Sequence, residues 1–121
     1  MAKILIQLPR FVEDEGRRIQ ITSFEKFYLD NIDRTFSTKK ATFRPEELAK
    51  NGFLEKKKDS YLLMDSDFVD DYKQLKRLAQ IITLKDIGRI ITLLGLTKES
   101  IVVEAGSGSG AAGIYLAKVV K

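Results

Sequence analysis

The segment from Ile101 to Gly113 places the strongest constraint on the fold, because it joins a β-branched run to a glycine-rich stretch. Ile101-Val102-Val103 is typical of a strand buried on both faces of a parallel sheet. The following glycines let the chain turn sharply and let a ligand approach the backbone with no Cβ in the way. Residues 111–121 predict a helix whose first N–H groups are available to a ligand. The pattern therefore predicts the first strand, loop and helix of a Rossmann-like sheet.

Two ligand motifs overlap in this loop. Gly108-Ser109-Gly110-Ala111-Ala112-Gly113 matches the dinucleotide fingerprint, which is weak evidence by itself. Glu104-Ala105-Gly106-Ser107-Gly108-Ser109-Gly110 matches the first motif of S-adenosylmethionine-dependent methyltransferases. The carboxylate of Glu104 would repel a pyrophosphate, whereas it would attract the sulfonium and ammonium groups of S-adenosylmethionine. The loop therefore favours S-adenosylmethionine as cofactor, with an NAD-dependent oxidoreductase as the alternative.

The residues before the loop show two patterns. Up to residue 64, short alternating runs predict strands, broken by a helical turn at Pro45–Lys50 and by a hairpin turn at Lys58-Asp59. From residue 65, apolar residues recur at helical spacing and predict a helix over 67–78. A second helix is predicted to begin after Thr83, as its cap, and to end at Gly95. We therefore expect an α+β or α/β chain, with a small β-rich domain over 1–64 and the start of a Rossmann-like methyltransferase domain over 65–121.

The composition narrows the possible chemistry. The chain has no Cys and no His, which excludes disulfides, zinc chemistry and Ser-His or Cys-His triads. We expect no metal site, and chemistry that depends on carboxylates, backbone dipoles or a cofactor. No apolar run approaches the roughly 20 residues that a membrane span needs. The N-terminus does not resemble a signal peptide, so we expect a cytoplasmic protein with no membrane association.

Positive charge gathers in the middle of the chain. The net charge is +4, and residues 34–58 contain eight basic and three acidic side chains. Such a cluster is either a solvated surface or an electrostatic footprint for nucleic acid. As RNA-binding candidates it supplies Arg34, Lys39, Lys40, Arg44, Lys56, Lys57 and Lys58.

A longer stretch resembles a known family. Arg77-Leu78-Ala79-Gln80-Ile81-Ile82-Thr83-Leu84-Lys85-Asp86-Ile87, followed by residues 101–110, is similar to the tRNA adenine-N1 methyltransferases that act at position 58 and, in archaea, also at position 57. That family also has a small N-terminal β domain and an Asp-Tyr pair on a helix, here Asp71-Tyr72. Thr83 and Leu84 depart from it, because the family usually has Tyr and Pro there.

The resemblance implies the roles of particular residues. Gln80, Ile81 and Ile82 would line the methionine side of the cofactor, although isoleucines in such positions are also ordinary core residues. The main cofactor loop would consist of Glu104, Gly106, Ser107, Gly108, Ser109 and Gly110. The β domain would contact tRNA through the basic cluster, mostly at phosphates.

No catalytic residue is expected within these 121 residues. The family's catalytic aspartate follows its fourth strand, and the residues after Thr83 are too few for a seven-stranded sheet. We therefore expect an N-terminal portion of the enzyme that is inactive by itself. Residues from about 97 onward should be disordered or should pack against another copy of the chain. We favour self-association, and hence a homo-oligomer, because the glycine loop between an apolar strand and an apolar helix can act as a hinge. The remaining alternatives are an isoaspartyl methyltransferase and an RNA-binding or oligomerisation module without catalysis.

Overall fold

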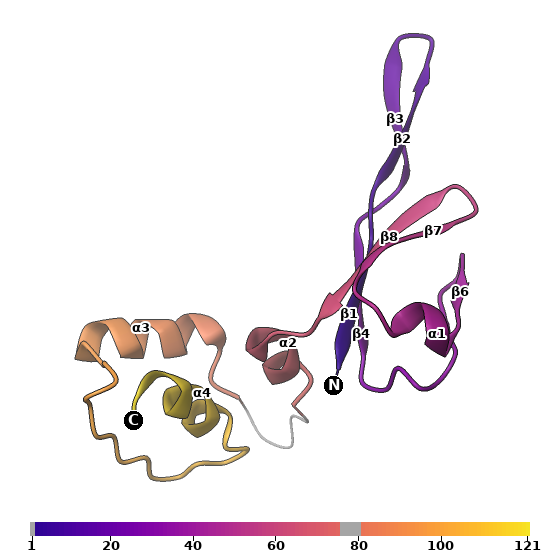
Figure 1. Cartoon of the computed structure of the whole chain (residues 1–121). Coiled ribbons are helices and arrows are strands. Elements are labelled where there is room, and N and C mark those ends of the chain that lie inside the picture. The colour runs from indigo at the N-terminus through magenta and orange to yellow at the C-terminus, as the bar shows by residue number, and fades with distance from the viewer. Residues whose placement is uncertain (1, 76–80) are drawn as a thin grey trace. The chain divides into compact units, whose positions relative to one another are not determined.

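The computed structural model describes residues 2–75 and 81–121. The chain forms two compact units, residues 1–71 and 72–121, and Figure 1 shows their elements. The described residues contain antiparallel sheets and four helices, so the α+β part of the predicted fold class is confirmed. None of these helices has the length and apolar character that a membrane span requires.

A four-stranded antiparallel sheet forms the centre of the first unit. Its strand order is β4-β1-β8-β7. The two central strands, β1 and β8, pair antiparallel, with Leu5 opposite Leu63 and Gln7 opposite Tyr61. The strand bounds are β1 Lys3–Gln7, β4 Glu25–Leu29, β7 Gly52–Lys56 and β8 Asp59–Asp65.

The core of this unit lies against one face of the sheet. Alternate residues of β1 and β8 point to the same face, which is why Leu5, Tyr61 and Leu63 are buried together. Phe43 comes from the two-residue strand β6 (Thr42–Phe43), which pairs with β5 (Phe36–Ser37). The Phe43 ring meets the Tyr61 ring edge to face, with centroids 4.9 Å apart. Helix α1 (Pro45–Leu48) is a single turn that places Leu48 in the same cluster.

A separate hairpin continues from the first strand. Strands β2 (Arg10–Asp14) and β3 (Arg17–Thr22) form a two-stranded sheet that extends away from the four-stranded sheet (Figure 1). Its turn places Glu15 and Gly16 at positive φ, as the sequence pattern predicts for Gly16. Ile19 and Ile21 both remain exposed, because no other described strand covers this hairpin.

Helix α2 (Phe68–Lys73) is shorter than predicted. The N–H of Leu75 donates to the carbonyl of Tyr72, three residues earlier, so the chain tightens into a turn after Lys73. The rest of the predicted helix, from residue 76, lies outside the described residues. Within the first unit, Lys26 of β4 forms an ion pair with Asp70, and the Tyr28 hydroxyl donates to Asp71 over 2.8 Å. This hydrogen bond is the main reason that the pKa of Tyr28 is raised.

Helix α3 (Leu84–Leu94) has the predicted ends. Thr83 Oγ1 accepts from the backbone N–H of Asp86 over 3.2 Å, and the Thr83 hydroxyl donates to the Asp86 carboxylate over 2.7 Å. Gly95 closes the helix in the left-handed conformation, with φ of 58°. The N-cap pattern and the C-terminal glycine therefore predicted both ends from local chemistry.

The predicted strand at 101–103 does not form. Ile101 and Val103 are 95% and 91% exposed, and no strand in the described residues pairs with them. A strand needs a neighbour to accept and donate its backbone hydrogen bonds, and no described strand does so for this segment. The prediction of a Rossmann-like strand–loop–helix is therefore wrong for the strand, whereas the turn at 107–110 and helix α4 (Ala111–Val119) are present. The predicted Lys58-Asp59 turn is also one residue out of place: Lys57 and Lys58 form it, because Asp59 pairs with Lys56.

Candidate functional site

The glycine loop has an unusual backbone. Gly106, Gly108 and Gly110 all have positive φ, between 54° and 74°. Side-chain-bearing residues adopt this region only with strain, so the alternating glycines are required by the path of the chain. Gly110 caps α4, and no side chain in the described residues caps this helix end. The first turn of α4 therefore presents backbone N–H groups and a partial positive charge.

The Glu104 carboxylate lies against this first turn. A Cβ on Gly113 would stand 2.3 Å from Glu104 Oε2, so the absence of a side chain at Gly113 makes room for the carboxylate. Gly113 is also the third glycine of the dinucleotide fingerprint, where it would normally permit close packing of a helix on a strand. In this chain it accommodates an acid. A pyrophosphate at the N-terminus of α4 would therefore be repelled by the negative charge of Glu104.

Ile81 and Ile82 line a cavity of the 72–121 unit. Its volume is about 360 Å³, and Tyr72 lines it together with them. The Tyr72 hydroxyl donates to the Ile82 carbonyl over 3.0 Å. The Tyr72 ring also meets the Tyr115 ring of α4 edge to face, with centroids 5.7 Å apart. Tyr72 thus links the segment at Ile82 to the helix that follows the glycine loop.

The structure does not bring the predicted cofactor residues into one cavity. Glu104 lines a separate cavity of about 290 Å³ with Val102, Gly113 and Leu116, which does not include Ile81 or Ile82. Gln80 lies outside the described residues. The sequence pattern also missed the role of Tyr72, although the Asp71-Tyr72 pair was a signal for it.

The basic cluster does gather around a cavity of the first unit. Thr38 Oγ1 accepts from the backbone N–H groups of Lys40 and Ala41, and this turn between β5 and β6 carries Lys39 and Lys40. The β7–β8 turn supplies the other lysines. A cavity of about 410 Å³ between the two turns is lined by Lys39, Lys40, Lys56 and Lys57, together with Thr38, Ala41 and Thr42. Four cations around one cavity attract an anion.

Acidic neighbours reduce part of this charge. Lys56 Nζ lies 2.5 Å from Glu47 Oε1. The backbone N–H of Arg44 donates to Glu47 Oε2 over 2.9 Å, and this bond, followed by the one from Lys56, lowers the pKa of Glu47. Arg44 and Lys56 line an adjoining cavity of about 680 Å³ with Glu46 and Glu47. Arg34 lines none of these cavities.

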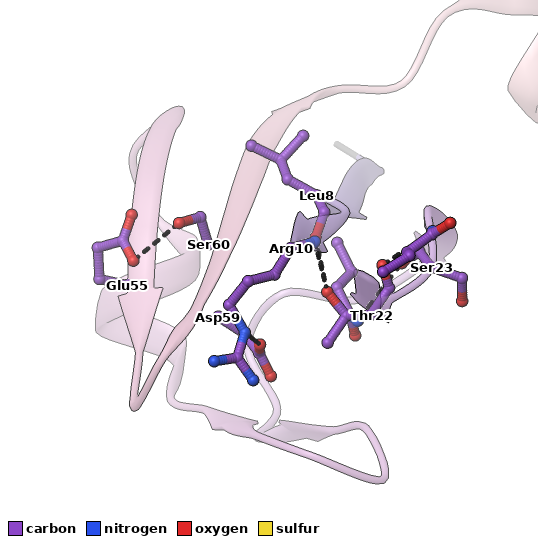
Figure 2. A network of polar contacts seen from close by, with 9 residues as sticks. Leu8, Arg10, Thr22, Ser23, Glu55, Asp59 and Ser60 are labelled. Atoms are coloured by element: carbon purple, nitrogen blue, oxygen red, sulfur yellow. Dashed lines mark hydrogen bonds and ion pairs between the residues drawn. The ribbon is translucent and has the colours of Figure 1, made fainter. Parts of the chain in front are cut away.

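Two arginines outside the predicted cluster extend the basic surface. Arg10 and Arg18 of the hairpin line a cavity of about 330 Å³ with Lys58. Arg10 Nε also forms an ion pair with Asp59 Oδ1 at 3.1 Å (Figure 2). Neither arginine stands out in the sequence, because the acids at 13–15 offset their positive charge when charges are counted along the chain.

Comparison with known proteins shows a similarity over part of the chain. No family model matches the chain. Over 61 residues, 50% of its length, the chain is 39% identical to the tRNA (adenine(57)-N(1)/adenine(58)-N(1))-methyltransferase TrmI of Methanocaldococcus jannaschii. Half of the chain resembles a tRNA adenine-N1 methyltransferase. This confirms the resemblance inferred from the motifs.

The match to TrmI has a defined extent. It spans 22% of the length of the archaeal enzyme. The TrmI name assigns methylation at N1 of adenines 57 and 58 to that relative.

Proposed function

We propose that the chain forms the tRNA-contacting and cofactor-loop portion of an S-adenosylmethionine-dependent tRNA adenine-N1 methyltransferase. In this proposal residues 1–64 contact tRNA and residues 65–121 begin a Rossmann-like cofactor domain. The similarity to TrmI supports the reaction class. The proposal also includes assembly of several copies, since Ile101 and Val103 are not covered by other described residues. We further propose a cytoplasmic location.

The position of Glu104 is the observation that favours S-adenosylmethionine over NAD as the cofactor. Its carboxylate lies at the first turn of α4, where Gly113 makes room for it. An acid at this position favours the cationic S-adenosylmethionine and disfavours the pyrophosphate of NAD. Glu104 would therefore attract the amino-acid end of the cofactor, while the loop backbone at 106–110 would lie beneath its ribose. Ile81 and Ile82 would contact the methionine side, and Gln80 would belong to the same set.

Calorimetric titration of the 121-residue chain with S-adenosylmethionine and with NAD tests this choice. We expect S-adenosylmethionine to bind and NAD not to bind. Glu104→Gln should weaken S-adenosylmethionine binding, whereas Glu99→Gln, an exposed acid before the loop, should not. Tighter binding of NAD than of S-adenosylmethionine, or equal effects of the two substitutions, would contradict the proposal.

Gly113→Ala provides a second test that leaves the Glu104 charge in place. The added Cβ should displace the carboxylate, since a flexible side-chain end can move aside. We expect weaker S-adenosylmethionine binding without loss of folding, as followed by circular dichroism. Unchanged binding would show that the position of the carboxylate against α4 is irrelevant to the cofactor.

The lysine cavity carries the proposal of tRNA binding. Lys39, Lys40 and Lys57 line it without an ion pair to any described acid, so they are candidates for phosphate contacts. Lys39 and Lys57 represent one turn each. Replacing both with Ala should weaken binding to tRNA and reduce the slope of log K against log salt by about 2 units, one for each contact. The matched control is the Lys85→Ala, Lys98→Ala double variant. Equal losses in both double variants would mean that only net charge matters.

In this proposal none of the residues assigned above holds the target adenine during methyl transfer. The related family uses an aspartate after its fourth strand to hold the target adenine, and no residue described above takes that role. The chain's own residues would position the cofactor and the tRNA, so that approach in line with the sulfonium lowers the barrier. We expect no transfer of labelled methyl to tRNA by the chain alone. Turnover above a no-enzyme control would contradict this assignment.

A further inference from the structure

The cavity beside the β2–β3 hairpin combines a flat apolar surface with positive charge. The Arg18 guanidinium lies over the Phe11 ring, with its central carbon 4.0 Å from the ring centroid, so the two side chains form a cation–π pair. Phe11 is 40% exposed, and Arg18 is exposed as well. Both line the cavity of about 330 Å³ that also contains Lys58. Ligand cavities in proteins begin at about this size.

A network of polar contacts holds the floor of this cavity (Figure 2). The backbone N–H of Arg10 donates to Thr22 Oγ1 over 2.8 Å, and the Thr22 hydroxyl donates to the Leu8 carbonyl over 3.3 Å. The N–H of Leu8 donates to the Ser60 carbonyl over 2.9 Å. Together with the Arg10–Asp59 ion pair, these bonds fasten the base of the hairpin to the β7–β8 hairpin. The cavity walls are therefore preorganised.

Charge on this cavity is positive. Its charged lining residues are Arg10, Arg18 and Lys58, and no acid lines it. Asp59 offsets Arg10, and Glu13 stands opposite Arg18 across the hairpin. Lys58 is not ion-paired with any described acid.

The cavity adjoins the lysine cavity through a single turn. Lys57 lines the lysine cavity and Lys58 lines the hairpin cavity. Consecutive Cα atoms are about 3.8 Å apart, so a strand of nucleic acid can contact both sides of the turn. Phosphates suit the lysine side, where no aromatic ring lines the cavity. A base suits the hairpin side, because aromatic rings and guanidinium planes stack on bases.

We propose that the hairpin cavity binds an unstacked nucleobase of an RNA whose phosphates contact the lysine cavity. The inference rests on the proposed tRNA binding and adds to it a site that distinguishes unpaired from paired nucleotides. The base stacks on the exposed face of the Phe11–Arg18 pair, while Lys58 neutralises its phosphate.

Fluorescence anisotropy with three labelled RNA duplexes tests this site on the full chain. One duplex is fully paired, the second has a single bulged adenosine, and the third has an abasic residue at the bulge. We expect the wild-type protein to bind the bulged duplex about tenfold more tightly than the other two, as one stacked base provides. Equal binding of the bulged and abasic duplexes would overturn the inference without any variant.

Two conservative variants locate the effect. Phe11→Leu keeps an apolar side chain but removes the aromatic face, and Arg18→Lys keeps the charge but removes the plane. Both should abolish most of the tenfold preference and leave binding to the paired duplex unchanged. Phe24→Leu is the matched control, because Phe24 is 58% exposed and lies outside this cavity.

The outcomes separate this inference from the proposed tRNA binding. Loss of affinity for all three duplexes in Lys39→Ala, Lys57→Ala, with no effect of Phe11→Leu, overturns the base site alone. Failure of the wild-type protein to bind any duplex overturns the proposed RNA binding and the base site with it. Equal weakening by Phe24→Leu and Phe11→Leu would assign the effect to general apolar contact and would overturn the base site.

Discussion

The two units differ in how far they bury their apolar residues. In residues 1–71, six side chains from two central strands, β4, β6 and α1 form one buried cluster. In residues 72–121, the buried side chains are few among those described, with Tyr72, Ile87 and Ala111 as the apolar ones. Leu93, Ile101 and Val103 are largely exposed there. The first unit thus completes its own core, whereas the second has apolar surface that its own described residues do not cover.

The difference follows from backbone pairing. Each central strand of the first unit has hydrogen-bonded neighbours on both sides, and leucine and aromatic residues then pack on a continuous face. The segment at 101–103 has the residue types of a central strand, but no strand in the part of the chain that the structure describes lies beside it. Apolar burial stabilises by roughly 25 cal/mol per Å², so exposed β-branched residues contribute little to folding.

Hydrogen exchange should reveal the largest contrast between the units. Amides of β1 and β8 are expected to be protected at least about a thousandfold, since they open only with the whole sheet. Amides at 101–103 should exchange nearly as fast as those of an unfolded peptide. Exchange measured by mass spectrometry at several protein concentrations checks this. Protection at 101–103 that grows with concentration, along with a rising mass in sedimentation, would support the proposed assembly. Strong protection in a monomer would contradict the contrast.

Matched leucine truncations should give the next largest effect. Leu63→Ala removes a fully buried side chain and should lower the free energy of unfolding of the first unit by about 2–5 kcal/mol. Leu93→Ala, at a residue 72% exposed, should change stability by less than about 0.5 kcal/mol. Urea titration followed by circular dichroism and by exchange in each unit measures both. A large cost at Leu93 would show that its side chain is covered in solution.

Much of this organisation could be predicted from short-range chemistry. The alternation at 18–22, the Thr83 cap and the Gly95 stop all depend on residues within a few positions of one another. The strand at 101–103 could not be predicted correctly, because strand formation depends on a distant partner that local pattern does not reveal. The cavity of Tyr72 was missed for the same reason, because contacts between distant segments form it. Arg10 and Arg18 were missed because the acids at 13–15 offset their charge along the sequence.

Two glycines allow a sharper comparison of helical positions. Gly88 in α3 has nothing within 4 Å of an added Cβ, so Gly88→Ala should stabilise the protein by about 0.5–1 kcal/mol. Gly113→Ala should stabilise the protein less than Gly88→Ala does, because the new Cβ displaces the Glu104 carboxylate. Adding Glu104→Ala should restore the gain at Gly113 and leave the gain at Gly88 unchanged. Thermal unfolding of the double-mutant cycle measures the coupling, and strict additivity would contradict the contact.

The smallest expected effect concerns pH. The pKa of Glu47 is lowered in the folded protein from 4.5, mainly by the Arg44 N–H and then by Lys56. The ionised Glu47 carboxylate therefore stabilises the folded protein above pH 4.5, and this contribution is lost as the pH falls through the lower pKa of the folded state. Glu47→Gln should cost less than about 1 kcal/mol at pH 7, as for exposed ion pairs, and the difference from wild type should shrink in acid. Glu46→Gln is the control, and an equal pH dependence in both variants would contradict the assignment.

At Lys57 the backbone conformation favours glycine, whereas the charge of the lysine cavity favours lysine. Lys57 has φ of 58° without being glycine, and this conformation costs a side-chain-bearing residue roughly 1–2 kcal/mol. Glycine would relieve that strain, but it would remove one of the four cations around the lysine cavity. The most comfortable residue for the backbone is therefore the wrong residue for attracting anions. An engineer who optimised this turn for heat resistance alone would thereby weaken its electrostatic attraction, and the two goals can be met together only by moving the charge to a neighbouring position.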